Sequence, residues 1–132
     1  MKALKSDYCL VPAAISDFTT RKTKGKIPSR KGGITLDLTP TPKILKAIRA
    51  KTKGVLVGFK AEFNVPAKVL EEKAKAMIKE SKLDFAVAND LKEVKRDRTK
   101  VLFIDGRGGK TEIQGTKSSV ADKIWSAVLH GL

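Results

Sequence analysis

The residues whose types suggest chemistry gather in one early segment, Val11–Gly33, which reads "VPAAISDFTTRKTKGKIPSRKGG". An apolar run reaches the carboxylate of Asp17, and basic residues follow it, interrupted by Gly25, Pro28 and Gly32–Gly33. Glycine and proline favour irregular backbone, and clustered lysine attracts phosphate and other anions. Three interpretations therefore stay open: an arm that binds nucleic acid, a charged loop that aids solubility, and a flap that closes over a phosphorylated ligand.

The composition predicts one globular domain, residues 1–132, in the cytoplasm. Of the 132 residues, 41% are hydrophobic and 32% charged, which is enough apolar material for a core. No apolar run approaches the roughly 18 residues that span a bilayer, and no signal peptide follows Met1. A single cysteine excludes an internal disulfide and fits a reducing compartment. The formal net charge of +14 predicts a polyanionic partner such as nucleic acid, a nucleotide or a phosphorylated metabolite.

Strand and helix patterns alternate along the chain, which predicts an α/β fold. Right-handed crossovers would make the central strands parallel and cover both faces with helices, giving a Rossmann-like three-layer sandwich that ends in a β-hairpin. We expect Asp17, Phe59–Glu62 and Asn89–Asp90 to follow strands along one ligand-binding edge. The expected strands are 8–14, 34–38, 55–59, 83–90, 100–105 and 111–114; the expected helices are 42–52, 66–82 and 116–129; and a mobile loop covers 16–33.

Other residues whose types could take part in chemistry fit structural roles better. Cys9 and Trp125 lie in apolar patterns and are expected in the core, whereas His130 suits a cation at a helix end. The first strand leads to "ISDF" with no glycine-rich phosphate turn, and "GRGG" at 106–109 is expected to be a hairpin turn. The sequence therefore lacks the usual glycine-rich phosphate-binding signature of a nucleotide domain.

Five short motifs follow one another along the chain at characteristic intervals: "AAISDF" (13–18), "GKI" (25–27), "LTPTPKIL" (38–45), "VGFKAE" (57–62) and "DFAVAND" (84–90). Together they resemble the CTP-dependent phosphopantothenoylcysteine synthetase family, also called phosphopantothenate–cysteine ligase. The closing "TKSSVADKIWSAV" (116–128) is similar to the last helix of that family. In many organisms the synthetase is the carboxyl-terminal half of a bifunctional coenzyme A biosynthesis flavoprotein. Full-length synthetases begin with a further Gly- and Thr-rich region, so the resemblance implies an incomplete domain that is inactive alone.

The resemblance implies a two-step ligation. The carboxylate of 4′-phosphopantothenate attacks the α-phosphate of CTP and forms an acyl-cytidylate and pyrophosphate; the amine of cysteine then displaces CMP. Mg²⁺ would accompany CTP, and FMN would belong only to a fused decarboxylase half. Such chemistry needs positioned reactants and cationic stabilisation of phosphoryl charge, to which a lysine on a closing lid is suited.

The resemblance assigns the catalytic lysine to Lys26, on the basic flap 18–33. Lys24, Arg30 and Lys31 remain alternatives, because the family often continues its K-I motif with further lysines. Asp17 matches an aspartate of the nucleotide site, which holds the metal or hydrogen-bonds the ribose or base. An ordinary turn or helix-capping aspartate is the competing interpretation.

Further expected contacts come from the elements that follow the flap in the sequence. Lys43 stands where the family has an aspartate, so backbone rather than carboxylate contacts are expected there. The family lysine three positions before Asp84 is replaced by Ser81, which leaves Lys79 or Lys82 to meet phosphate. The remaining expected site residues are Thr41, Pro42 and Ile44 at the nucleotide, Phe59 against the base, and Asn89 in a structural turn. Ala13 and Ala14 of the first motif also belong to the expected site, without an assigned contact.

Two alternatives from other functional classes stay open. A nucleic-acid module would use the 21–31 arm for phosphate contacts, although an aromatic content of 5% and the absence of a recognised binding motif disfavour it. A non-catalytic dimerisation domain would pair two copies, with 99–114 as the expected contact. The resemblance itself implies a homodimer, no membrane and a fused or associated phosphopantothenoylcysteine decarboxylase.

Overall fold

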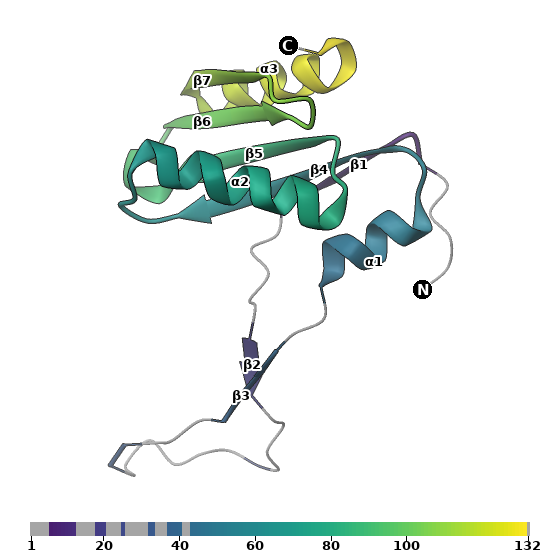
Figure 1. The fold of residues 1–132 in the computed structure, drawn as a ribbon. Helices are drawn as coiled ribbons and strands as arrows, with labels where there is room; N and C mark the ends of the chain where they lie inside the picture. The colour runs from purple at the N-terminus through teal and green to yellow at the C-terminus, as the bar shows by residue number, and fades with distance from the viewer. Residues whose placement is uncertain are drawn as a thin grey trace.

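A computed structural model describes residues 6–12, 18–20, 25, 32–33, 37–40 and 43–131. Its centre is a five-stranded sheet with the strand order β1-β4-β5-β6-β7. These strands are β1 (Tyr8–Val11), β4 (Val55–Glu62), β5 (Phe85–Asp90), β6 (Arg98–Asp105) and β7 (Lys110–Thr116). The strands β1, β4 and β5 are parallel, and β6 and β7 continue the sheet as an antiparallel hairpin (Figure 1). The expected parallel sheet with a terminal hairpin is thus confirmed.

Helices cover both faces of this sheet, as expected. On one face, α1 (Ile44–Lys51) and α2 (Ala67–Ser81) pack over a core that includes Leu56 and Ala86. On the other face, α3 (Lys117–His130) packs over Val57 and Val87, and Figure 1 shows it on the far side of the sheet from α2. Leu56 and Val57 are neighbours that point to opposite faces, because side chains alternate along a strand. This explains why the continuous apolar run of β4 is buried on both sides.

A second, two-stranded sheet lies apart from the main one (Figure 1). It pairs β2 (Phe18–Thr20) with β3 (Leu38–Pro40) in antiparallel register. Phe18–Thr20 was expected in a loop, so this part of the loop prediction is wrong. Of the strand expected at 34–38, residues 34–36 lie outside the described residues, and Leu38 belongs to β3, which pairs with β2 and not with the main sheet.

The aromatic residue of α3 corrects a second expectation. Trp125 is 44% exposed and makes an edge-on contact with Tyr8 of β1, with ring centroids 5.5 Å apart. The buried residues of α3 are Val120, Ile124 and Val128, which repeat every four positions. Trp125 is one position beyond this stripe, so it turns toward the outer strand β1 instead of the core.

Two further features complete the element order. A 3₁₀ turn, η1 (Leu91–Glu93), connects β5 to β6. Within the described ranges no helix has the length and apolar content needed to cross a membrane. The helix expected from residue 42 begins at Ile44, and β1 ends at Val11 before the expected end of that strand.

Gly58 sits where α2 and the sheet approach most closely. A Cβ atom added there would lie 2.6 Å from Cδ1 of Leu83 and 3.2 Å from Cε of Met77. We predict that Gly58→Val lowers the free energy of unfolding by about 1–3 kcal/mol, because overpacking displaces well-packed neighbours. Urea denaturation measures this change. Gly33→Ala is the matched control, since its added Cβ meets no atom within 4 Å; equal destabilisation by both variants would contradict the packing explanation.

Glu71 ties α2 to the hairpin and should make stability depend on pH. Its carboxylate accepts hydrogen bonds from Lys75 Nζ at 2.6 Å and from Lys110 Nζ at 2.9 Å. These bonds, that of Lys75 foremost, lower the pKa of Glu71 from 4.5 to about 2. A carboxylate with a lowered folded-state pKa stabilises the fold above its unfolded pKa, and this stabilisation is lost as the pH falls.

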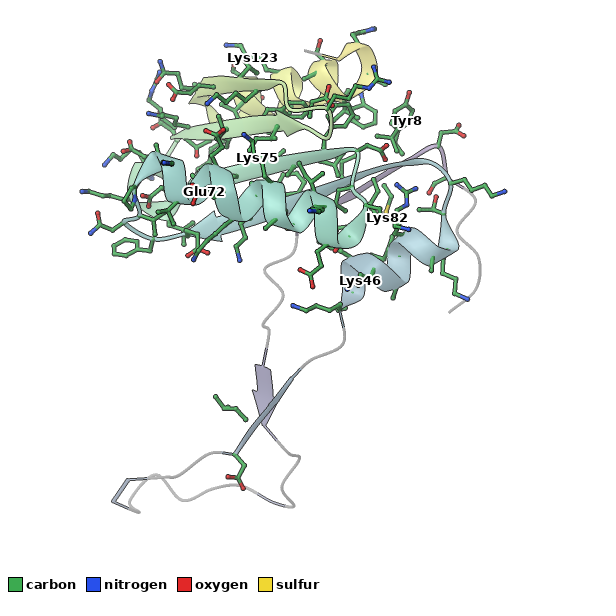
Figure 2. All side chains as sticks on the ribbon, in the orientation of Figure 1. Tyr8, Lys46, Glu72, Lys75, Lys82 and Lys123 are labelled. Atoms are coloured by element: carbon green, nitrogen blue, oxygen red, sulfur yellow. The ribbon has the colours of Figure 1, made fainter. Side chains whose placement is uncertain are left out.

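We therefore predict that the urea midpoint of the unmodified chain falls between pH 4.5 and about 2 more steeply than that of Glu71→Gln. Both proteins should approach the same midpoint at the acid end of this range. Glu72→Gln is the control, because Glu72 is an exposed neighbour on α2 (Figure 2). If Glu72→Gln flattened the pH profile as much as Glu71→Gln, the two lysine contacts would not be the cause.

Candidate functional site

The strands β4 and β5 run side by side and end at the same edge of the sheet. Their register pairs Phe59 with Val87, Ala61 with Asn89, and Glu62 with Asp90. Phe59 is half-buried and packs against the core beneath α3. Asn89 follows Val87 by two positions, so it lies on that same face of the sheet. The structure thus places the predicted residues Phe59 and Asn89 on one face of two parallel strands, Asn89 near the carboxyl end of β5 and Phe59 three positions before that of β4. Sheets of α/β proteins bind their ligands beyond these carboxyl ends.

The carboxylate of Asp90 joins the two connections that leave this edge. Asp90 Oδ1 accepts from the backbone N–H groups of Asn64 at 2.7 Å and Lys92 at 3.0 Å, and Oδ2 accepts from Val65 N–H at 3.1 Å. These backbone hydrogen bonds, that of Lys92 foremost, lower the pKa of Asp90 below its ordinary value. Asp90 is therefore an ionised group whose two oxygens already have partners.

Glu62, the second carboxylate at this edge, is also engaged. Glu62 Oε1 accepts from Lys73 Nζ at 2.9 Å and lies 3.4 Å from Lys60 Nζ. The hydrogen bond from Lys73, with the charge of Lys60, lowers the pKa of Glu62. Among the described residues, no three His, Cys, Asp or Glu side chains come together as a metal site would require.

The other predicted residues of the described chain lie across the opposite face, where α1 begins and α2 ends. Lys43 and Lys46 place their Nζ atoms 4.0 and 3.7 Å from Glu80 Oε1 on α2. Ile44 opens α1, and Lys79 stands on the last turn of α2. Lys82 follows directly as a left-handed cap with φ 52° (Figure 2). In this second group the carboxylate of Glu80 is shared by two lysines, Lys43 and Lys46.

The two groups are not one cluster. Lys82 lies three positions before the start of β5, whereas Asn89 lies near the end of that strand. A six-residue strand spans about 20 Å, so these two side chains stand at opposite edges of the sheet. The remaining predicted residues lie outside the described residues: the catalytic Lys26, the nucleotide contacts Asp17, Thr41 and Pro42, and Ala13 and Ala14.

A groove of about 450 Å³ lies away from both groups. It is lined by Lys110, Thr111 and Ile113 of β7 and by Lys123, Ser126 and Ala127 of α3. None of the site residues expected from the sequence lines it.

A family model for the DNA/pantothenate metabolism flavoprotein C-terminal domain matches residues 1–132. The chain belongs to that family. The bifunctional coenzyme A biosynthesis protein CoaBC of Thermococcus kodakarensis is 32% identical over 130 residues, which cover 97% of this chain and 32% of the relative. CoaBC of Methanocaldococcus jannaschii is 35% identical over 120 residues, which cover 89% of this chain and 30% of the relative. The chain thus spans about a third of the length of the curated relatives that it matches.

Solved structures share the fold of this flavoprotein C-terminal domain. The DNA/pantothenate metabolism flavoprotein from Streptococcus pneumoniae superposes with a TM-score of 0.79 at 21% identity, over 95% of this chain and 63% of that chain. A Cab2 variant in complex with phosphopantothenate-cysteine superposes with a TM-score of 0.61 at 22% identity, over 88% of this chain and 41% of that chain. The family resemblance seen in the sequence motifs and the α/β fold are both confirmed.

Sequence reasoning about this domain missed Arg49 of α1, a side chain that joins several segments of the described chain. Arg49 Nη1 donates to Asp84 Oδ2 at 3.0 Å and to Lys82 O at 3.3 Å, and Nη2 donates to the carbonyls of Thr52 and Gly54 at 2.9 and 2.6 Å. Asp84 Oδ2 also accepts from Leu56 N–H at 2.8 Å. The sequence offered one signal, an aspartate between a helix end and a buried strand, but not its partner 35 positions away.

We predict that Arg49→Met lowers the free energy of unfolding by about 1–3 kcal/mol, because charged hydrogen bonds contribute more than neutral ones and their partners are left unpaired. Arg49→Lys should recover only part of this loss, since an ammonium group cannot reproduce the planar fork of guanidinium. Urea unfolding measures both variants. Lys51→Met, an exposed change on the same helix, is the control, and a loss as large as that of Arg49→Met would contradict a role specific to the guanidinium.

Proposed function

We propose that this chain is the CTP-binding part of a phosphopantothenate–cysteine ligase in coenzyme A biosynthesis. One observation carries the proposal: "VGFKAE" and "FAVAND", two motif strings of the synthetase resemblance, lie on adjacent parallel strands in register from Val57↔Phe85 to Glu62↔Asp90. Their carboxyl ends therefore share the edge at which α/β sheets bind ligands. The relatives named CoaBC and the Cab2 complex with phosphopantothenate-cysteine support the same pathway for this chain.

Within this proposal the roles follow the chemistry of each side chain. Lys26 neutralises charge on the α-phosphate as the acyl-cytidylate forms, and Asp17 contacts the nucleotide or its metal. Phe59, three positions before the end of β4, offers a ring for contact with the base. Lys79 belongs to the separate group near Glu80, so its positive charge would serve a phosphate group other than those of the nucleotide at Phe59.

Mg²⁺ fits the proposal as an ion that arrives with the triphosphate. Oxygen atoms are its preferred ligands, and it is commonly held by substrate phosphates with one or two carboxylates. Glu62 and Asp90, the carboxylates at the described edge, already accept hydrogen bonds from lysine and backbone groups. Asp17 is thus the carboxylate of the expected site that we assign to the metal, and bound Mg²⁺ would supply charge neutralisation of the phosphates.

Calorimetric titration with CTP and Mg²⁺, compared with ATP and with a short DNA duplex, tests the proposal. We predict that CTP binds preferentially and that Lys26→Ala weakens its binding roughly 10- to 100-fold, as expected for losing one charged hydrogen bond to phosphate. Lys123→Ala, an exposed change on α3 (Figure 2), should leave the affinity for CTP unchanged.

The same titration separates the alternative based on charge alone. Binding that results from net positive charge weakens steeply with added salt and does not distinguish CTP, ATP and DNA. Equal responses to all three ligands, lost together as the salt concentration rises, would overturn the nucleotide-site proposal. They would favour instead the nucleic-acid arm at 21–31.

A further inference from the structure

Asp90 holds a turn that belongs to a different strand. The turn 63–65 follows β4, and its Asn64 and Val65 amides both donate to the Asp90 carboxylate at 2.7 and 3.1 Å. The third donor, the Lys92 amide, comes from η1, which follows β5. A single carboxylate therefore joins the connections that leave two neighbouring strands at the proposed ligand edge.

The turn needs such support because its backbone is costly. Asn64 has φ 52°, in the left-handed region that residues other than glycine seldom occupy. The Asn64 side chain also accepts a hydrogen bond from Lys92 Nζ at 3.3 Å. Directly after the turn, α2 begins at Ala67, and its N-cap residue Pro66 makes no side-chain capping hydrogen bond. Asp90 thus fixes both a strained residue and the approach to an uncapped helix.

The turn also determines what the edge presents to a ligand. Phe63 lies in it with 69% of its surface exposed, and the adjacent Glu62 is the last residue of β4. Glu62 is held in turn by Lys73 of α2 at 2.9 Å. A change in the turn would therefore move the end of the "VGFKAE" strand, an exposed ring and the first residues of α2 together.

We propose that Asp90 is a positioning residue of the nucleotide site: its carboxylate fixes the turn 63–65, and it neither binds metal nor transfers protons. Three of the about four acceptor sites of its carboxylate are taken by backbone donors, which favours holding the turn over binding Mg²⁺ or accepting a proton. This assignment rests on the proposed function, because it takes the edge of β4 and β5 as the nucleotide side.

The first test follows the turn itself. Asp90→Asn should raise amide hydrogen-exchange rates, measured by NMR, at Asn64, Val65 and Lys92 on the order of tenfold, because a neutral amide oxygen accepts more weakly than a carboxylate. Asp105→Asn is the matched control: Asp105 also ends a strand and accepts a turn amide, that of Arg107 at 2.7 Å, but at the opposite edge. Unchanged exchange at Asn64 and Val65 in Asp90→Asn would overturn the role in holding the turn.

The second test follows CTP binding in the same proteins. Asp90→Asn should weaken binding on the order of tenfold, by a factor that is the same with and without Mg²⁺, whereas Asp105→Asn should not change it. Loss of affinity only in the presence of Mg²⁺ would identify Asp90 as a metal ligand and overturn the proposal. Faster exchange in the turn with unchanged CTP affinity would overturn the positioning role.

A second-site change shows whether Asp90 acts through the turn. Glycine adopts positive φ without steric cost, so Asn64→Gly added to Asp90→Asn should restore part of the CTP affinity. A direct contact between Asp90 and the ligand would not be restored in this way. If the unmodified chain bound no nucleotide, the proposed function would fail, and Asp90 would lose its role at a nucleotide site; the exchange rates would still decide whether it holds the turn.

Discussion

The guanidinium of Arg49 is the contact on which the layered structure depends most. It joins the end of α1, the approach to β4, the cap of α2 and the start of β5 through one side chain. The Arg49 side chain is 18% exposed and its partner Asp84 is 45% exposed, so the pair is only partly withdrawn from water. In such a setting geometry matters more than Coulomb attraction, because exposed pairs gain little net energy. The contribution of Arg49 lies in satisfying several carbonyl groups where four segments converge.

Asp84 and Asp90 bracket β5 and perform matching tasks at its two ends. Asp84 accepts from the Leu56 amide at the start of β4, and Asp90 accepts from the Asn64 and Val65 amides just beyond the end of β4. In "DFAVAND", Asp84 therefore binds a backbone amide of β4, and Asp90 binds backbone amides of the turn that follows β4. The two acidic positions of this motif are explained by the alignment of β5 with β4, without any contact to a ligand.

The surplus of positive charge is not neutralised locally, because several acidic residues are each shared by two lysines. The chain has 28 lysine and arginine residues but only 14 aspartate and glutamate residues. Glu62, Glu71 and Glu80 each lie within 4 Å of the amino groups of two lysines. Acidic groups shared in this way cannot neutralise the surface, so a positive field remains and favours the approach of anions.

The sequence predicted those parts of the fold that depend on local patterns. The alternation of apolar strands and helices predicted the parallel sheet, the hairpin and the two covered faces. The spacing of apolar residues indicates whether a strand or helix is buried on one side or on both. The pairing of Phe18–Thr20 with Leu38–Pro40 and the exposure of Trp125 were missed. Both depend on which segments meet in space, and local spacing carries little information about that.

The candidate site could likewise be predicted where it depends on local patterns and not where it depends on which segments meet in space. Phe59 and Asn89 could be placed near each other because each belongs to a strand whose direction the crossover rule fixes. Both were expected to follow a strand, and this detail is wrong, because β4 and β5 extend past them to Glu62 and Asp90. Lys82 could not be placed, since its place depends on where α2 ends, and its left-handed cap puts it beside Arg49 at the other edge of the sheet. A ligand group that meets Lys82 is therefore not the one that meets Asn89. The lysines of α2 belong with the start of α1, through Glu80, and the ring of Phe59 belongs with the carboxyl edge.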